Sequence, residues 1–444
     1  MPYIPHTEDD VRAMLATIGV ESIDELFREV PEDMRFTREL NVPEGLDERR
    51  LAHHLQVLAE RNLDLSRVTC FLGAGIYDRF IPATVGAVIS RGEYLTAYTP
   101  YQPEASQGYL QTIYEFQSLI AELYGMDLAN ASMYDAATSM AEAAIMATAI
   151  TKRNVVAVSE AVHPHTRQVI ETYCWAMGIE VRLLKTPAGS TTDFSGLDDS
   201  VACLCVQYPN FFGVIEDLGV QREESSRVGA MLIVSADPTA SALLIPPGEF
   251  GADVVVGEGQ PLGLPMGFGG PLLGLFACKK EYVRLIPGRI VGRTVDAQGR
   301  SGFTMTLRTR EQDIRREKAT SNICTNEALM ALASTVYMSA LGKNGIRKVA
   351  ESTVRNTQYA LTKLTEAGAK VKFAGRVFGE FTLELPGKDA EAVRDRLLES
   401  GILAGLPLGG YYPDLANCLL VAVTEVRTRE EIDTFAARLK EALA

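Results

Sequence analysis

The middle of the chain alternates short apolar runs with amphipathic segments. Helical patterns at His165–Met177 and Gln221–Val228 separate runs that are rich in Val, Ile and Leu. Strands that are apolar throughout and are separated by helices predict a parallel sheet covered on both faces, with ligands at the carboxyl ends of its strands. The predicted strands are Asn154–Val158, Glu180–Leu184, Ala202–Val206, Ala230–Val234 and Asp253–Val256.

Residues 1–65 show helical spacing instead. Two stretches, Thr7–Asp10 and Ser22–Glu25, have the spacing of a capping box or its aspartate variant, and the second is followed by apolar residues at helical intervals. A further helix is predicted over Asp47–Asn62. We interpret this part as a helical arm. Amphipathicity alone does not show whether the arm packs on its own domain or wraps a partner subunit.

The rest of the chain divides into a large α/β domain, residues 66–310, and a third part, residues 311–444. The pattern of the third part predicts long helices that lead to a small α+β domain. Thr428 is the expected N-cap of its last helix. The predicted helices are 327–341, 344–367, 389–399 and 430–443, and the predicted strands are 370–373, 380–385 and 419–422.

Composition narrows the classes of protein that this chain can belong to. A net charge of −14 argues against nucleic acid or an anionic membrane as a partner. Acidic residues stand where a leader peptide would need cations, and there is no apolar run of ~18 residues. The seven cysteines are scattered without zinc spacing, so we expect buried free thiols, no metal and a cytoplasmic location.

Three stretches resemble the cofactor site of a pyridoxal-phosphate (PLP) enzyme with the aspartate-aminotransferase fold: Val234–Thr239, Gly257–Gln260 and Gly267–Pro271. Such a site needs a carboxylate at the pyridine nitrogen and a lysine that holds the aldehyde. Asp237 is the candidate carboxylate, although it could instead cap the next turn. Gln260 stands where the lysine would be, and a glutamine amide cannot form an imine, so the covalent anchor is missing.

The remaining parts of such a site have weaker candidates. Thr138 and Ser139 precede an Ala-rich helix whose N-terminus could hold a phosphate. Asp135 would repel that phosphate, so a capped helix without a ligand is the favoured alternative. His163 follows a predicted strand and could stack on the pyridine ring. His163 and His165 could also be two ligands of a metal site, but no cluster of further metal ligands accompanies them in the sequence.

No other lysine is a good replacement for the missing anchor. Lys279 and Lys280 lie beyond the predicted return strand Leu272–Cys278, where a solvated pair of charges is expected. Lys318 lies in a polar run that indicates either a surface helix or a loop that lines a site.

Three longer runs carry a resemblance to a known family: Phe71–Asp78, Tyr98–Gly108 and Thr309–Thr325. They resemble the N-terminal half of glycine decarboxylase, the P-protein of the glycine cleavage system. In that family two homologous halves form one long chain or are separate proteins, and the cofactor lysine belongs to the second half. The resemblance implies the PLP-dependent transferase fold (fold type I, α/β) for this chain, which would be a separate first half, the α subunit.

The resemblance also implies partners and a reaction. A β subunit would bind PLP and pair with this chain in an α2β2 oxidoreductase. The complex would decarboxylate glycine and transfer the aminomethyl group to the lipoyl arm of H-protein. The α chain alone would be inactive. It would supply one wall of the β site, for which the candidates are Tyr98, Tyr101, Gln102, Arg293 and Thr294.

The reasons for these candidates come from the residues themselves. Tyr98, Tyr101 and Gln102 lie in a loop stiffened by prolines, which suits an interface or a site wall, with ordinary surface as the alternative. Arg293 and Thr294 follow the return strand, where, in the fold that the resemblance implies, residues of the partner subunit commonly meet a PLP phosphate. Two other classes of function stay open at this point: a self-sufficient PLP aminotransferase or decarboxylase with another lysine, and a purely structural partner subunit.

Overall fold

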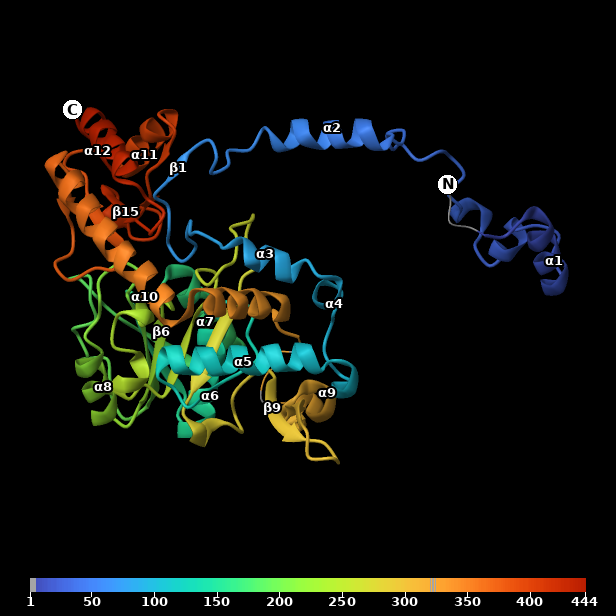
Figure 1. Cartoon of the computed structure of the whole chain (residues 1–444), viewed down its shortest axis with the longest axis horizontal. Coiled ribbons are helices and arrows are strands. Elements are labelled where there is room, and N and C mark those ends of the chain that lie inside the picture. Colours follow the sequence, from blue (N-terminus) through green and yellow to red (C-terminus); the bar gives the residue numbers. More distant parts are fainter. Residues whose placement is uncertain (1–4, 320, 322, 324) are drawn as a thin grey trace. The chain divides into compact units, whose positions relative to one another are not determined.

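The computed structural model describes residues 5–319, 321, 323 and 325–444. Contacts within this described part divide it into two units, Met1–Leu63 and Asp64–Ala444 (Figure 1). We describe each unit by itself.

The first unit contains helices α1 (Glu8–Ile18) and α2 (Glu48–Ala59). Thr7 caps α1 through a reciprocal capping box with Asp10, and Asp47 caps α2, so both helix starts are confirmed. None of the described residues in these helices is buried.

The helix predicted after Ser22 is wrong. That segment forms only a short 3₁₀ turn over Asp24–Phe27, and the hydrogen bond from the Glu25 amide to the Ser22 hydroxyl is long at 3.4 Å. The apolar side chains Ile23 and Phe27 remain exposed. A helix of this length needs packing against an apolar surface to be stable, and these residues do not obtain it within their unit.

The second unit is built around a large sheet. In the described part of the chain, seven strands follow the order β2-β8-β7-β6-β5-β3-β4. The strands from β7 to β4 pair in parallel, and β8 pairs antiparallel with both of its neighbours, β7 and β2. The predicted parallel strands are confirmed to within a residue or two. The bounds are β2 (Leu128–Ala129), β3 (Val155–Ser159), β4 (Glu180–Leu184), β5 (Val201–Tyr208), β6 (Met231–Ala236), β7 (Val254–Glu258) and β8 (Gly274–Cys278).

Helices cover both faces of this sheet, as the apolar strands predicted (Figure 1). Along β5, Leu204 and Val206 belong to one core cluster and Cys203 and Cys205 to the other, because successive side chains point to opposite faces. The first cluster includes α5 (Gln107–Tyr124), α8 (Leu218–Arg227) and the start of α10 (Ala328–Glu366); the second includes α6 (Ala136–Thr151) and α7 (Pro164–Ala176).

The long helix α10 leads from the large sheet to a smaller one. It breaks at Gly342, where φ is 62° and ψ is 178°, in agreement with the two helices predicted on either side. Among the described residues, four strands form the sheet β11-β12-β15-β14. Thr428 caps the last helix through a capping box, as predicted. The bounds are β11 (Lys370–Val371), β12 (Glu380–Glu384), β14 (Leu406–Pro407), β15 (Cys418–Ala422), α11 (Ala390–Glu399) and α12 (Arg429–Leu443).

Shorter elements complete the second unit. β9 pairs with β10 in an antiparallel hairpin, and β1 pairs with β13. Their bounds, with the short helices, are β1 (Thr69–Cys70), α3 (Ala83–Ile89), α4 (Gly92–Leu95), β9 (Ile290–Val295), β10 (Ser301–Thr306), α9 (Gln312–Arg315) and β13 (Ile402–Leu403). The described cysteines are buried and free, as expected, and Cys324 lies outside the described residues. No helix in the described part is long and apolar enough to cross a membrane.

Candidate functional site

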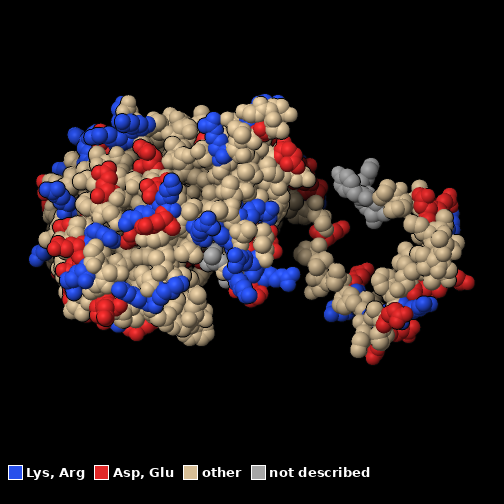
Figure 2. All heavy atoms as spheres, turned by 90° about the horizontal axis from the view of Figure 1, so that it is seen from below, with Lys and Arg blue, Asp and Glu red and all other residues tan. Residues whose placement is uncertain are grey.

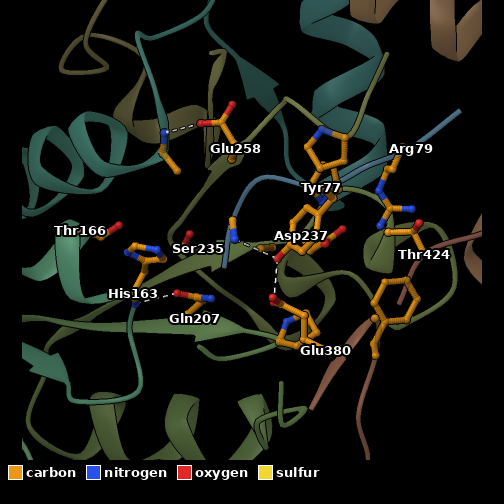
Figure 3. A pocket seen from close by; sticks show the side chains of 18 residues that line it. Tyr77, Arg79, His163, Thr166, Gln207, Ser235, Asp237, Glu258, Glu380 and Thr424 are labelled. Carbon is orange, nitrogen blue, oxygen red and sulfur yellow. Dashed lines mark hydrogen bonds between the residues drawn. The ribbon is translucent and has the colours of Figure 1, made fainter. Parts of the chain in front are cut away.

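A cavity of about 100 Å³ lies at the carboxyl ends of the parallel strands (Figure 3). His163 reaches it after β3, Gln207 from β5, Asp237 after β6 and Glu258 from the end of β7. The loop that carries Tyr77 and the strand β12 close the other side. This is the edge at which open parallel sheets bind ligands.

Asp237 lines the cavity and also caps the next turn. Its Oδ1 accepts hydrogen bonds from the amides of Thr239 at 2.7 Å and Ala240 at 2.9 Å. The predicted cap is therefore present, and Asp237 also lines the cavity.

Gln260 does not point into the cavity. Its amide accepts a hydrogen bond from the Tyr77 amide at 3.0 Å and donates to the carbonyls of Tyr77 at 3.0 Å and Leu264 at 2.9 Å. The side chain is 2% exposed. Gln260 thus holds the backbone of the Tyr77 loop against the end of β7, and a buried amide with these partners is satisfied at both its oxygen and its nitrogen.

The N-terminus of α6 is occupied by carboxylates of this chain. Asp135 accepts from the Thr138 amide at 2.7 Å, and the Ser139 hydroxyl donates to the Asp135 carbonyl at 2.6 Å. Glu258 accepts from the Ala136 amide at 3.2 Å (Figure 3). Thr138 and Ser139 therefore form local caps, and two amides of the helix start, those of Ala136 and Thr138, are already bound to carboxylates.

Glu258 is held by further backbone groups. It also accepts from the amides of Gln260 at 3.0 Å and Leu273 at 2.9 Å. Burial raises the pKa of the Glu258 carboxyl to about 7, although these backbone hydrogen bonds act in the opposite direction. Glu258 was not predicted from the sequence. The only signal was an acidic residue ending a strand that is otherwise apolar.

His163 is fixed by contacts at both ring nitrogens. Its Nδ1 accepts from the His165 amide at 3.1 Å, so Nε2 carries the proton and donates to the Ala74 carbonyl at 3.0 Å. The ring also lies 4.9 Å from that of Phe211, edge to face. Burial lowers the pKa of His163 to about 4, so the ring is neutral near pH 7. No metal-ligand cluster occurs among the described residues.

The Tyr77 loop fills the side of the cavity nearest the small sheet. The Tyr77 hydroxyl donates to Glu380 at 2.7 Å (Figure 3). Glu380 also accepts a hydrogen bond from the Ala74 amide at 2.6 Å. Burial raises the pKa of Glu380 to about 7. Arg79 pairs with Glu425 at 2.6 Å, so its charge is neutralised inside the protein. The sequence did not predict these contacts, which join positions some 300 residues apart.

The candidate replacement lysines lie elsewhere. In the described part of the chain no lysine lines the cavity. Lys279 forms an ion pair with Asp253 beyond the end of β8, and Lys318 is exposed.

The residues predicted to line a partner's site lie on the surface. Tyr98 is 72% exposed and Tyr101 51% exposed. Gln102, Arg293 and Thr294 are also exposed, the last two on β9. These residues do not line the cavity described above.

The arrangement does not fit a bound PLP. Asp237 and the His163 ring, the candidates for the carboxylate and the stacking ring of such a site, both line the cavity. However, the lysine is replaced by a buried amide, and the phosphate position faces Asp135 and Glu258 instead of free amides. Carboxylates beside a phosphate repel it, and the one buried cation lining the cavity, Arg79, is paired within the described residues.

The fold nevertheless defines the class. The chain has the aminotransferase-like fold of PLP-dependent enzymes of fold type I. A crystal structure of alanine–glyoxylate aminotransferase from Nostoc sp. superposes with a TM-score of 0.61 over 86% of this chain and 97% of that chain, at 19% identity. At that identity the likeness shows the fold alone.

The chain belongs to the glycine cleavage system P-protein family, whose model matches residues 1–439. It is similar to the "probable glycine dehydrogenase (decarboxylating) subunit 1" of Geobacillus sp. (strain WCH70), at 51% identity over 98% of each chain. The protein of the same name from Desulforamulus reducens is 50% identical over 99% of each chain. A crystal structure of glycine decarboxylase (P-protein) in inhibitor-bound form covers 100% of both chains with a TM-score of 0.91 and 43% identity. The expected family and fold are confirmed.

Proposed function

We propose that this chain is the α subunit of a heteromeric glycine decarboxylase, and that it carries no PLP itself. A β subunit binds the cofactor, two αβ pairs form an α2β2 complex, and the complex works in the cytoplasm. Its substrates are glycine and the lipoyl arm of H-protein. The name "subunit 1" of the relatives supports a partner subunit, and their end-to-end similarity supports the same role for this chain.

One observation carries the proposal. The position of the missing lysine is occupied by a buried amide that is bound to the backbone of Tyr77 and Leu264. The α6 N-terminus beside it is bound to carboxylates. Because groups of this chain occupy both positions, the cavity supports a structural contribution by the α chain, with the cofactor chemistry in its partner.

We propose that the α chain contributes a wall of the β site. The candidates remain Tyr98, Tyr101, Gln102, Arg293 and Thr294, whose exposure leaves them available to a partner. Of the two tyrosines, Tyr101 has cationic neighbours: its ring lies 5.7 Å from the Arg289 guanidinium and 5.9 Å from that of Arg308.

The test measures glycine decarboxylation with lipoylated H-protein for the α chain, the β chain and their mixture. The proposal expects turnover only in the mixture and no PLP absorbance in the purified α chain. Turnover by the α chain alone would identify a self-sufficient enzyme instead.

A second experiment separates a wall of the site from a purely structural subunit. Tyr101→Ala should reduce turnover of the reconstituted complex while its mass stays unchanged. Trp175→Ala is the matched control, since Trp175 is a more exposed aromatic residue on α7. Equal activity of the two variants would favour the purely structural subunit.

A further inference from the structure

Positive charge is concentrated in one segment of an acidic protein. The chain has a net charge of −14, yet residues 284–318 contain nine Lys and Arg against four Asp and Glu. The segment includes β9, β10 and α9. Figure 2 views the molecule from the side on which β9 and α9 lie in Figure 1; blue and red side chains are interspersed on that face, and one group near the middle of the view is mostly blue.

Most of the acidic residues in this segment are already paired. Asp296 pairs with Arg300 at 2.7 Å, Asp313 with Arg308 at 3.0 Å, and Glu311 with Arg289 at 3.6 Å. Within the described part of this segment, five exposed cations take part in no ion pair: Arg284, Arg293, Arg315, Arg316 and Lys318. Arg293 donates to the Ser301 hydroxyl at 2.9 Å, and we call the other four the basic strip.

The loop that presents the strip is fixed. Arg310 is buried and donates to the carbonyls of Ile286 and Gly288, which ties the loop to the segment that follows Arg284. The Arg315 Nε donates to the Thr309 carbonyl at 3.2 Å. These hydrogen bonds join the backbone that follows Arg284 to the segment that carries Arg315.

Arg316 adds a sign of backbone strain. Its φ is 52° and its ψ is −123°, a left-handed conformation that a residue with a Cβ rarely adopts. Such strain costs about 1–3 kcal/mol and persists where the surrounding structure imposes it, often at binding sites.

We propose that the basic strip is a docking surface for an acidic protein that binds the complex transiently. The inference rests on the proposed function, because that function requires a carrier protein to approach and leave the complex in every turnover. Clustered charge suits such encounters, since it accelerates association without requiring a large apolar interface. The overall negative charge of the chain disfavours nucleic acid as the occupant.

The test uses the reconstituted complex with lipoylated H-protein as the varied substrate. A triple charge reversal, Arg284→Glu with Arg316→Glu and Lys318→Glu, should raise KM for H-protein about tenfold at low salt and leave kcat within twofold. The difference should shrink at ~0.3 M salt, because exposed charges are screened. KM of the wild-type complex should itself rise with salt, a measurement that needs no variant.

The matched control reverses three exposed cations of the small domain, Lys370→Glu, Arg396→Glu and Lys440→Glu. It should leave KM within about twofold. The proposal is overturned if KM for H-protein is unchanged in the strip variant, or if the strip variant and the control variant change KM equally. It is also overturned if KM of the wild-type complex does not change with salt concentration. Strip-dependent binding of a fluorescent oligonucleotide at physiological salt would also overturn it in favour of nucleic acid. An inactive wild-type complex would contradict the proposed function instead.

Discussion

At the scale of single residues, the side chain of Gln260 links two segments through their backbones. It bonds to the amide and carbonyl of Tyr77 and to the carbonyl of Leu264, and it is almost fully buried. Glutamine suits this position because one side chain supplies both an acceptor and donors. The residue that marks the missing cofactor anchor is thus also a structural residue of this chain.

Gln260→Ala should therefore destabilise the protein. The substitution leaves buried backbone groups without partners, at about 1–3 kcal/mol for each unsatisfied group. We expect a loss of roughly 3 kcal/mol or more in the free energy of unfolding, measured by urea denaturation. Gln298→Ala, in the exposed turn between β9 and β10, is the control and should stay within ~0.5 kcal/mol. If Gln260→Ala lowers the free energy of unfolding by no more than the control does, the structural role of Gln260 is contradicted.

Glu258 predicts a dependence of stability on pH. Its carboxyl pKa is raised by burial from 4.5 to about 7, so the folded state binds a proton that the unfolded state has lost between these values. The contribution of Glu258 to the free energy of unfolding is fully present below about pH 4.5 and is lost as the pH rises to about 7. Its size is ~1.4 kcal/mol for each unit by which the folded and unfolded pKa values differ. Glu258→Gln should remove this slope.

Urea titrations between pH 4.5 and 7 test this prediction. The stability of Glu258→Gln relative to the wild type should increase with pH. The opposite contribution of His163, whose pKa is lowered to about 4, cancels because both proteins contain it. A difference that does not change with pH would show that Glu258 is ionised throughout.

At the scale of elements, the sequence predicted best where the pattern is local. The parallel strands, the break in α10 and the caps at Thr7 and Thr428 depend on neighbouring residues, and the structure confirms them. The helix after Ser22 failed because helical spacing does not supply a packing partner. The contacts of Glu380 with Ala74 and Tyr77 could not be predicted, because they depend on how β12 meets a distant loop.

Helix α6 gives a test at this scale. Asp135→Ala should cost about 1 kcal/mol of stability, because it removes the N-cap of the helix. Asp389→Ala removes the comparable cap of α11 and is the matched control. The α6 variant should still not bind inorganic phosphate in a calorimetric titration, since Glu258 continues to occupy the Ala136 amide. Phosphate binding by this variant would contradict the closed site.

At the scale of the whole molecule, the described buried residues lie in the second unit. The buried core begins at Cys70, and the helices of the first unit contribute none of its described members. Many large apolar side chains of the first unit are exposed, for example Met34 and Leu40. Apolar surface of this kind is typical of segments that become covered in an assembly.

Deletion of residues 1–63 should therefore leave the unfolding midpoint of the α chain unchanged within a few degrees, measured by calorimetry. If the arm wraps the partner, the truncated chain should also fail to form a stable complex with the β subunit in sedimentation experiments. A large drop in the midpoint of the isolated chain would show instead that the arm packs on its own domain.

The central claim is that the complex carries PLP in the partner and not in this chain. The most direct measurement is borohydride reduction of the co-expressed complex, followed by mass spectrometry of the peptides from both chains. We predict one pyridoxyl-modified lysine in the β subunit and none in the α chain, with both chains present in equal amounts. Stoichiometric pyridoxyl modification of any lysine of the α chain, including Lys279 or Lys318, would contradict the account.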